Sequence, residues 1–233
     1  MKKQKQPAPN ADTNSKPVLR LDWCTHEAAK YAVEKWHYSR SMSVGKQVFI
    51  GVWESGEFIG AVIFGRGANR HMAGEFGLTV IQCVELTRVA ISQHATAVSR
   101  IVMIAIKKLV AQSPGLRLIV SYADPEHGHY GGIYQAMGWG YIGTSRPQSS
   151  IVGMHKRTAT AKYGTTKGLP RTKSTWKHKY IMPLDAAMRA QIEPLRKPYP
   201  KRVRGVDSDT SANHAEEGGA NPTRTLSSPE GNQ

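Results

Sequence analysis

Residues 116–143 hold the densest group of side chains in this chain that could do chemistry. The apolar run from Leu116 to Tyr122 has the pattern of a buried strand, and Pro125 prevents that strand from continuing. The loop that follows carries titratable and aromatic groups: Asp124, His127, His129, Tyr130 and Tyr134. Because strand ends in α/β sheets commonly form ligand sites, we expect these groups to share one crevice.

Asp124 is the first candidate to orient a substrate or accept its proton, because it directly follows the strand. The alternative is a turn cap, a common role for aspartate at a strand end. His37 and Tyr38 end a helix that Asp22 or Thr25 can cap. His37 is the second candidate base, since its ordinary pKa suits proton exchange near neutrality. A histidine there is also favoured by the helix dipole alone.

A metal site is an alternative use of the same side chains. Two histidines and one carboxylate are a known ligand set for iron. Residues 127–129 read His-Gly-His, a spacing that is also common in loops without a metal. The nitrogen and oxygen donors that this hypothesis needs are His37, Tyr38, Asp124, His127 and His129.

Arg88 is a charge inside the predicted strand Cys83–Ile91, where alternation places it on one face with Val84, Leu86 and Ala90. An arginine in such a setting needs an anionic partner. That partner is either Glu85 or a bound phosphate, carboxylate or developing oxyanion. The following helix, from about Thr96 to Gln112, can be capped by Thr96 or Ser99, and its free N–H groups favour an anion.

Length and composition bound the class of protein. A chain of 233 residues with 39% apolar residues can bury one sizeable core. No run of about 18 apolar residues occurs, so we expect no membrane span, and the lysine-rich start has no apolar segment typical of a signal peptide. Two cysteines, Cys24 and Cys83, favour a reducing compartment such as the cytoplasm.

The positive charge is concentrated in one segment. The net charge is +15, and residues 151–205 hold 14 Lys/Arg against 2 Asp/Glu. This predicts binding to a polyanion, with nucleic acid as the first suspect; the alternative is a solvated basic loop. The residues expected to follow a phosphate backbone are His155, Lys156, Arg157, Lys162, Arg171 and Lys173.

The order of elements predicts an α/β (α+β) domain over residues 17–185, between a disordered tail at 1–16 and a largely disordered tail at 186–233. A mixed sheet covered by helices fits this order. A basic excursion, 146–175, separates the last two strands. The expected elements are a hairpin of 47–54 and 57–65, strand 83–91, helix 96–112, strand 116–122, short helix 133–137 and strands 141–143 and 176–184.

The strand, helix, strand order followed by Gly132–Trp139 resembles the core of the GNAT acyltransferase superfamily. This resemblance implies a GNAT-like mixed sheet whose central parallel strands splay apart to admit acetyl-CoA or a related acyl-CoA. It places Tyr134 where the family protonates the departing thiolate, and it assigns Arg88, Thr96 and Ser99 to the cofactor. The family's glycine-rich phosphate loop has no counterpart in Gln93–Val98, which leaves the Thr96 and Ser99 hydroxyls to contact the phosphates.

A closer resemblance, over about residues 20–185, is to the Mom proteins of Mu-like phages. It rests on motifs in the same order: Glu27–Ser39, Phe64–Asn69, Glu85–Ala90 and Ala123–Gln135. It implies a transferase that adds a methylcarbamoyl or acetamido-type group to the exocyclic amine of adenine in double-stranded phage DNA. Such a modification protects the DNA from host restriction, and it would take place in the host cytoplasm.

Work on adenine within a duplex implies base flipping, with aromatic side chains stacking on the extruded base. The candidates for stacking are Trp36, Tyr38, Tyr130 and Trp139. Attachment of the group through its methylene carbon would call for iron, whereas acyl transfer would not. Two other functions stay open: an acetyltransferase acting on a protein or small amine, and a non-catalytic DNA-binding protein on a GNAT frame.

Overall fold

The computed structural model describes residues 17–43, 45–66, 71–147, 149, 151–152, 156–172 and 175–201, and of residues 156–158 the backbone only. In this part of the chain the elements are β1 Leu19–Trp23, α1 His26–Trp36, β2 Gln47–Glu54, β3 Glu57–Gly65, η1 Gly74–Phe76, β4 Cys83–Ile91, α2 Val98–Gln112, β5 Leu118–Ala123, η2 Pro125–His127, α3 Gly132–Ala136, β6 Gly140–Thr144, α4 Lys156–Tyr163, β7 His178–Pro183, α5 Ala186–Ile192 and η3 Glu193–Leu195.

One mixed sheet organises the domain, with strand order β1-β2-β3-β4-β5-β7-β6. Its central pair, β4 and β5, is parallel, and the neighbouring pairs are antiparallel. The parallel pairing begins at Cys83 with Leu118 and ends at Leu86 with Ser121. Beyond that point β4 continues alongside β3, while β5 continues alongside β7. The predicted splay of the central parallel strands is therefore confirmed.

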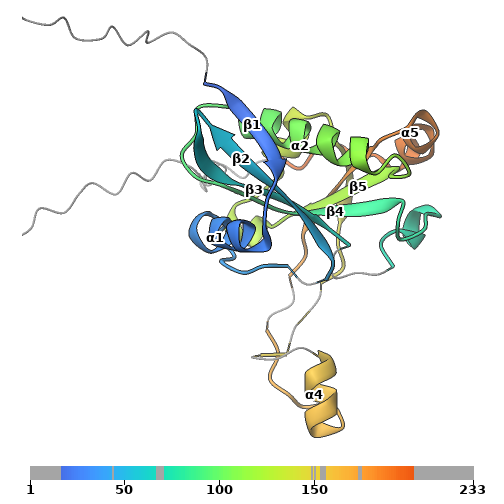
Figure 1. Ribbon diagram of the computed structural model, residues 1–233. Helices are drawn as coiled ribbons and strands as arrows, with labels where there is room; N and C mark the ends of the chain where they lie inside the picture. Colours follow the sequence, from blue (N-terminus) through green and yellow to red (C-terminus); the bar gives the residue numbers. More distant parts are fainter. Residues whose placement is uncertain are drawn as a thin grey trace, which may run out of the picture.

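Helices cover both faces of the sheet, as predicted (Figure 1). The apolar stripe of α2, which includes Ile101, Val102 and Ala105, packs on one face in the larger core cluster. Ala29, Ala32 and Val33 of α1 pack on the opposite face. The apolar positions of each helix recur at spacings of three and four, so each helix buries one stripe and leaves the other side to solvent.

The face assigned to Arg88 needs a correction. The pairing of β4 with β3 skips a residue, so that Ile63 lies opposite Arg88 and Phe64 lies opposite Leu86. Such a bulge reverses the alternation of side chains beyond it. Leu86 and Phe64 therefore point to the α2 core, whereas Arg88 and Ile63 lie on the face of α1. Strict alternation, which placed Arg88 with Leu86, was wrong here.

Other differences from the sequence prediction concern ends of elements. β1 was not expected; it pairs with β2 at the edge of the sheet. α2 begins at Val98 with no side-chain cap, so neither Thr96 nor Ser99 caps it. α1 is capped by Thr25, whose hydroxyl accepts from the Ala28 N–H at 3.2 Å. None of the helices in the described ranges is long and apolar enough to cross a bilayer.

The domain extends past residue 185, which corrects the predicted C-terminal boundary. α5 and η3 follow β7 directly, and Met188 and Ile192 are buried against the sheet. Further along, the Tyr199 hydroxyl donates to the Trp139 carbonyl at 2.8 Å. Short apolar runs between prolines hid this segment from periodicity. The tails 1–16 and 202–233 lie outside the described residues.

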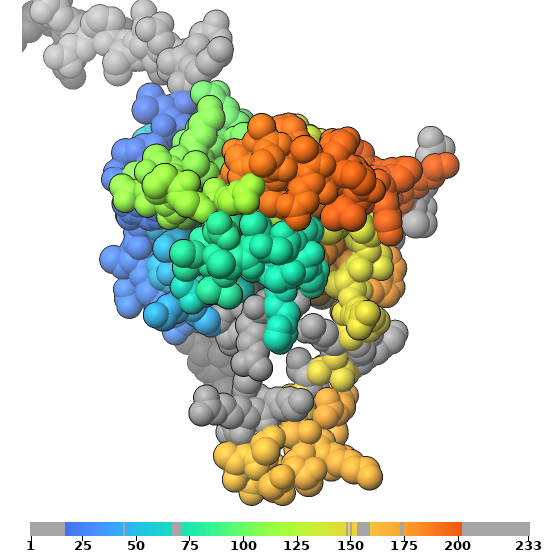
Figure 2. Space-filling view, turned by 90° about the vertical axis from the view of Figure 1, so that its right-hand side faces the viewer, coloured from blue at the N-terminus to red at the C-terminus, as the bar shows by residue number. Residues whose placement is uncertain are grey.

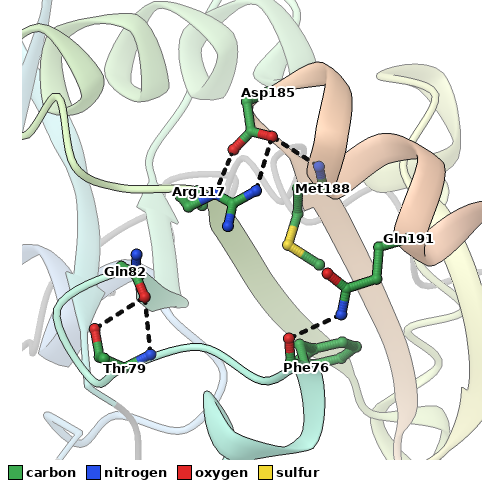
Figure 3. A network of polar contacts seen from close by, with 7 residues as sticks. All are labelled: Phe76, Thr79, Gln82, Arg117, Asp185, Met188 and Gln191. Atoms are coloured by element: carbon green, nitrogen blue, oxygen red, sulfur yellow. Dashed lines mark hydrogen bonds and ion pairs between the residues drawn. The ribbon is translucent and has the colours of Figure 1, made fainter.

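An ion pair fixes α5 to the start of β5 (Figure 3). The Arg117 guanidinium donates to both Asp185 oxygens, at 2.7 and 3.1 Å, and Asp185 Oδ1 also accepts from the Met188 N–H at 2.7 Å. Asp185 thus caps the helix while it binds Arg117. The Arg117 hydrogen bonds and the Met188 amide lower the pKa of Asp185 to about 2.

Replacing Asp185 by Asn should destabilise the protein at neutral pH. A carboxyl with a depressed pKa stabilises the fold above its unfolded-state value, and that contribution is lost as pH falls from 3.8 towards about 2. Urea unfolding of Asp185→Asn across this range should show a weaker pH dependence than the wild type. Glu193→Gln, on exposed η3, is the control. Equal stability of Asp185→Asn and wild type at pH 7 would contradict this role.

Candidate functional site

The site lies where β4 and β5 part. The Ser121 Oγ is 2.8 Å from the Leu86 carbonyl, which belongs to the last residue paired across these strands, and 2.7 Å from the Tyr134 hydroxyl. α3 brings Tyr134 to this point, as the sequence predicted for a crevice after β5. Tyr134 is buried, and this burial raises the pKa of its phenol. The phenol therefore stays protonated and can act as a donor.

Close packing holds the turn before α3 in place. Gly131 has φ +80, and a Cβ there would lie 2.3 Å from Cε2 of Tyr180. The Tyr180 hydroxyl and the Gln135 side-chain amide both donate to the Tyr130 carbonyl. Glycine is thus required at position 131 by both conformation and space.

Tyr38 gathers three imidazoles around its ring. The ring centroids of His37, His127 and His129 lie 4.4, 4.5 and 4.8 Å from that of Tyr38. Tyr38 itself is 43% exposed. The end of α1 and the loop after β5 therefore meet in one aromatic surface that is open to solvent, which is the convergence expected from the sequence.

His37 is buried, with its Nδ1 accepting from the Ser39 N–H at 3.1 Å. Burial, together with the nearby charge of Arg88, lowers the pKa of His37 to about 3. The ring is therefore neutral near pH 7. Our reason for considering His37 as a base was its ordinary pKa, and this reason does not hold in the folded protein.

Asp124 lies at the centre of the polar contacts. It is 5% exposed, and its Oδ2 is 3.0 Å from the Lys177 Nζ and 3.5 Å from Nδ1 of His127. Its Oδ1 accepts from the Glu126 N–H at 3.1 Å, so Asp124 also caps η2. Both sequence interpretations of Asp124, turn cap and site residue, fit this geometry. Lys177 was missed, because 53 positions separate it from Asp124.

Arg88 and Glu85 complete the charges around the site. The Arg88 Nε donates to the Ser41 carbonyl at 3.1 Å, which ties the segment after α1 to β4. Burial raises the pKa of Glu85 to about 7, although Arg88 and Lys177 oppose that rise. A carboxyl that titrates near neutrality is suited to proton transfer. From the sequence we considered Glu85 only as a partner for Arg88, because the alternation of residues along β4 does not reveal that the Glu85 carboxyl is buried.

The expected iron ligands do not form a metal site. Among the residues that the structure describes, no three His, Cys, Asp or Glu side chains converge as ligands of one ion would. Instead the imidazoles of His37, His127 and His129 pack against the Tyr38 ring. The donors that looked sufficient in number are therefore engaged in ring stacking and in the contacts of Asp124.

The candidates for stacking on a base divide into two groups. Trp139 is 1% exposed and contacts Tyr134 in the core. Trp36 packs against Phe58, on the inner side of α1. These two tryptophans stabilise the fold. Of the four candidates, Tyr38 and the partly exposed Tyr130 are the two that present aromatic surface beside the site.

The basic excursion projects from the body of the domain, with α4 at its far end (Figures 1 and 2). A bridge between Ile151 and Arg171 joins its two arms, and the Val152 N–H donates to the Pro170 carbonyl at 3.0 Å. Lys162 and Arg171 are exposed. Lys156 and Arg157 belong to α4, where the structure describes their backbone only. His155 and Lys173 lie outside the described residues.

The base of this excursion is joined to the site. The Ser145 N–H donates to the Lys177 carbonyl at 2.8 Å, and the Lys177 N–H donates to the Ser145 hydroxyl at 3.0 Å. The Lys177 ammonium then reaches Asp124. The same residue thus closes the two arms of the excursion and contacts the central carboxylate, so the basic segment begins beside the site.

The loop just before α2, where the resemblance places the phosphates of acyl-CoA, already binds a carboxylate of the chain itself. The amides of Ala95 and Thr96 donate to the carboxylate of Glu54, at 2.7 and 2.9 Å. Thr96 is 7% exposed. The residues at this position therefore do not fit a pyrophosphate group, and we assign no step to a coenzyme held here.

With a splayed mixed sheet and this site established, the comparisons with known proteins identify the family. Residues 18–201 match the Mom protein family, and the chain belongs to that family. No curated protein matches the chain. The match begins and ends close to the limits of the folded domain, since it includes β1 and the segment after α5.

Solved structures similar to this chain include acyltransferases. A putative acetyltransferase from Acinetobacter baylyi has 14% identity and a TM-score of 0.45, covering 73% of this chain and 94% of its own. FeeM, an N-acyl amino acid synthase from uncultured soil microbes, has 11% identity and a TM-score of 0.45, covering 78% and 96%. A Bacillus subtilis acetyltransferase in complex with CoA has 14% identity and a TM-score of 0.39, covering 73% and 100%.

His37→Gln should make the fold less sensitive to acid. A histidine with a depressed pKa stabilises the fold above its ordinary pKa of 6.5, and this contribution is lost as pH falls towards about 3. Each pKa unit corresponds to about 1.4 kcal/mol. Denaturant unfolding from pH 7 to pH 4 measures the effect, with His26→Gln on exposed α1 as control. Parallel wild-type and His37→Gln curves would show that His37 is not buried neutral.

Proposed function

We propose that this protein is a DNA-modifying transferase that adds a methylcarbamoyl or acetamido-type group to the exocyclic amine of adenine in double-stranded DNA. The observation that carries the proposal is the contact between the site and the base of the basic excursion. Lys177 lies two positions after the end of the basic excursion and contacts Asp124 at 3.0 Å. A surface suited to phosphates therefore leads directly to a cluster of groups suited to proton transfer. Membership of the Mom family agrees with this assignment.

The substrate chemistry explains why such groups are needed. The exocyclic amine of adenine is a weak nucleophile, because its lone pair is conjugated with the ring. The base must leave the duplex to be reached, and aromatic side chains then stabilise it by stacking. Tyr38 offers an exposed ring that neighbouring imidazoles hold in place. We assign the extruded adenine to the surface formed by Tyr38 and Tyr130.

The transfer replaces one N–H bond of the amine by an N–C bond to the incoming group. The proton passes to a carboxylate, for which Asp124 is our first choice and Glu85, with a pKa of about 7, the second. The leaving group departs from the donor with the electron pair of the broken bond. Tyr134, a buried phenol with a raised pKa, is placed to donate to it. Arg88 is the candidate to stabilise negative charge as it develops.

Nucleoside mass spectrometry of DNA from cells that express the protein tests this function. Wild type should yield a mass-shifted deoxyadenosine, and Asp124→Asn should reduce it at least about 100-fold, a usual effect of losing a general base. Asp22→Asn, which changes a partly exposed aspartate on β1 that pairs with Lys108, is the matched control. Circular dichroism would show that both variants fold.

The results separate the function from the residue role. Unmodified adenine in cells with abundant, folded wild-type protein would overturn the proposed function. Modification that persists in Asp124→Asn would instead remove Asp124 from the chemistry. Acetyl transfer by the purified protein to a small amine or a protein, without DNA, would favour an ordinary acetyltransferase.

The basic excursion should set DNA affinity through counterion release. Each phosphate contact contributes a slope of about −0.9 in log K against log salt. The double variant Lys162→Ala/Arg171→Ala should therefore weaken binding and make the slope shallower by about 1.8. The matched control is Arg100→Ala/Lys107→Ala, two exposed charges on α2. Fluorescence anisotropy with one duplex over a range of salt measures both. An unchanged slope in the excursion variant would place the DNA elsewhere.

A further inference from the structure

We propose that Glu54 occupies the backbone amides of Ala95 and Thr96 in the loop before α2, so that the donor of the transferred group is not held at these amides by a pyrophosphate. The inference rests on the proposed function only in assuming that a donor molecule is bound. Which anion the backbone amides of this loop bind does not depend on that function. It limits the donor to molecules that are recognised without this loop.

The contact is a two-point one. Glu54 Oε2 accepts from the Ala95 N–H at 2.7 Å, and Oε1 accepts from the Thr96 N–H at 2.9 Å. Charge-assisted bonds of this length are among the stronger hydrogen bonds in proteins. Burial alone would raise the pKa of Glu54, but the hydrogen bonds from Ala95 and Thr96 outweigh it and lower the pKa. Glu54 is therefore an anion at neutral pH.

The position of Glu54 on the sheet makes this contact rigid. It is the last residue of β2, paired with Leu19 on one side and with Glu57 across the hairpin on the other. On the other side of the contact, the Ser92 N–H donates to the Ile59 carbonyl at 2.8 Å, which fixes the start of the loop against β3. The backbones on both sides of the contact are thus anchored to the sheet, which holds the carboxylate and the two amides within reach of each other.

A pyrophosphate would have to displace this carboxylate. A pyrophosphate held by this loop would need the N–H groups of Ala95 and Thr96, which Glu54 already occupies, and two anions cannot share them without strong repulsion. The loop also lacks glycine, so side chains of Thr96 and Val98 stand where a phosphate would approach the backbone. The donor must therefore reach Tyr134 through the gap where β4 and β5 part. Arg88 and Lys177 are the residues that would recognise it there.

A titration followed by NMR tests this directly, because the amide signals of Ala95 and Thr96 report on the contact. Coenzyme A and inorganic pyrophosphate are the probes, added to the full-length wild type, Glu54→Ala and Glu57→Ala. Glu57 is an exposed carboxylate on the same hairpin and serves as the matched control. In wild type and Glu57→Ala, neither probe should shift these two signals in a saturable way up to millimolar concentration.

Removing the carboxylate should open the position. Glu54→Ala should bind pyrophosphate at the Ala95 and Thr96 amides at least ten times more tightly than wild type. Saturable shifts of these signals by coenzyme A in wild type would overturn the proposal, and so would the lack of any gain in Glu54→Ala. If Glu54→Ala does not fold, the wild-type titration decides alone. The readout is binding, so it stays independent of whether adenine is modified.

Discussion

The parting of β4 from β5 is the constraint on which the rest of the structure depends. Two parallel strands that pair only as far as Leu86 and Ser121 leave backbone and side-chain groups of both strands without a neighbour across the gap. The Ser121 hydroxyl bonds the Leu86 carbonyl at this point, and Tyr134 packs against both. The bulge in β4 then turns Arg88 towards α1. The site exists because the sheet opens here.

Desolvation gives the groups around this opening their chemical character. Burial keeps His37 neutral, keeps Tyr134 protonated and brings Glu85 into the neutral range. Nearby positive charges lower the pKa of His37, as burial does, and they also lower the pKa of Glu85, which burial raises. Burial is therefore the dominant cause of both pKa shifts. A set of ordinary side chains thereby becomes a donor, a proton acceptor and a neutral ring within one surface.

The chain uses its own carboxylates where a ligand's anion might be expected. Glu54 accepts from the amides of Ala95 and Thr96 in the loop before α2, and Asp124 both caps η2 and pairs with the ammonium of Lys177. The basic excursion has few such partners in its described part, and this leaves Lys162 and Arg171 to solvent. Exposed positive charge is therefore available on the excursion, whereas beside the site the ammonium of Lys177 is paired with Asp124. This distribution of charge agrees with a protein that binds a polyanion through the excursion and catalyses a reaction at the site in the domain.

The sequence alone determined the elements with strong local patterns. β2, β3 and β4 begin and end where alternation and the turn at residues 54–57 predict. Motif order predicted the family. Tertiary structure decided what depends on distant contacts: the face of Arg88, the pairing of Asp124 with Lys177, and the binding of Glu54 to the α2 loop. Periodicity describes neighbours along the chain, whereas burial and charge pairing arise only when strands far apart in sequence meet.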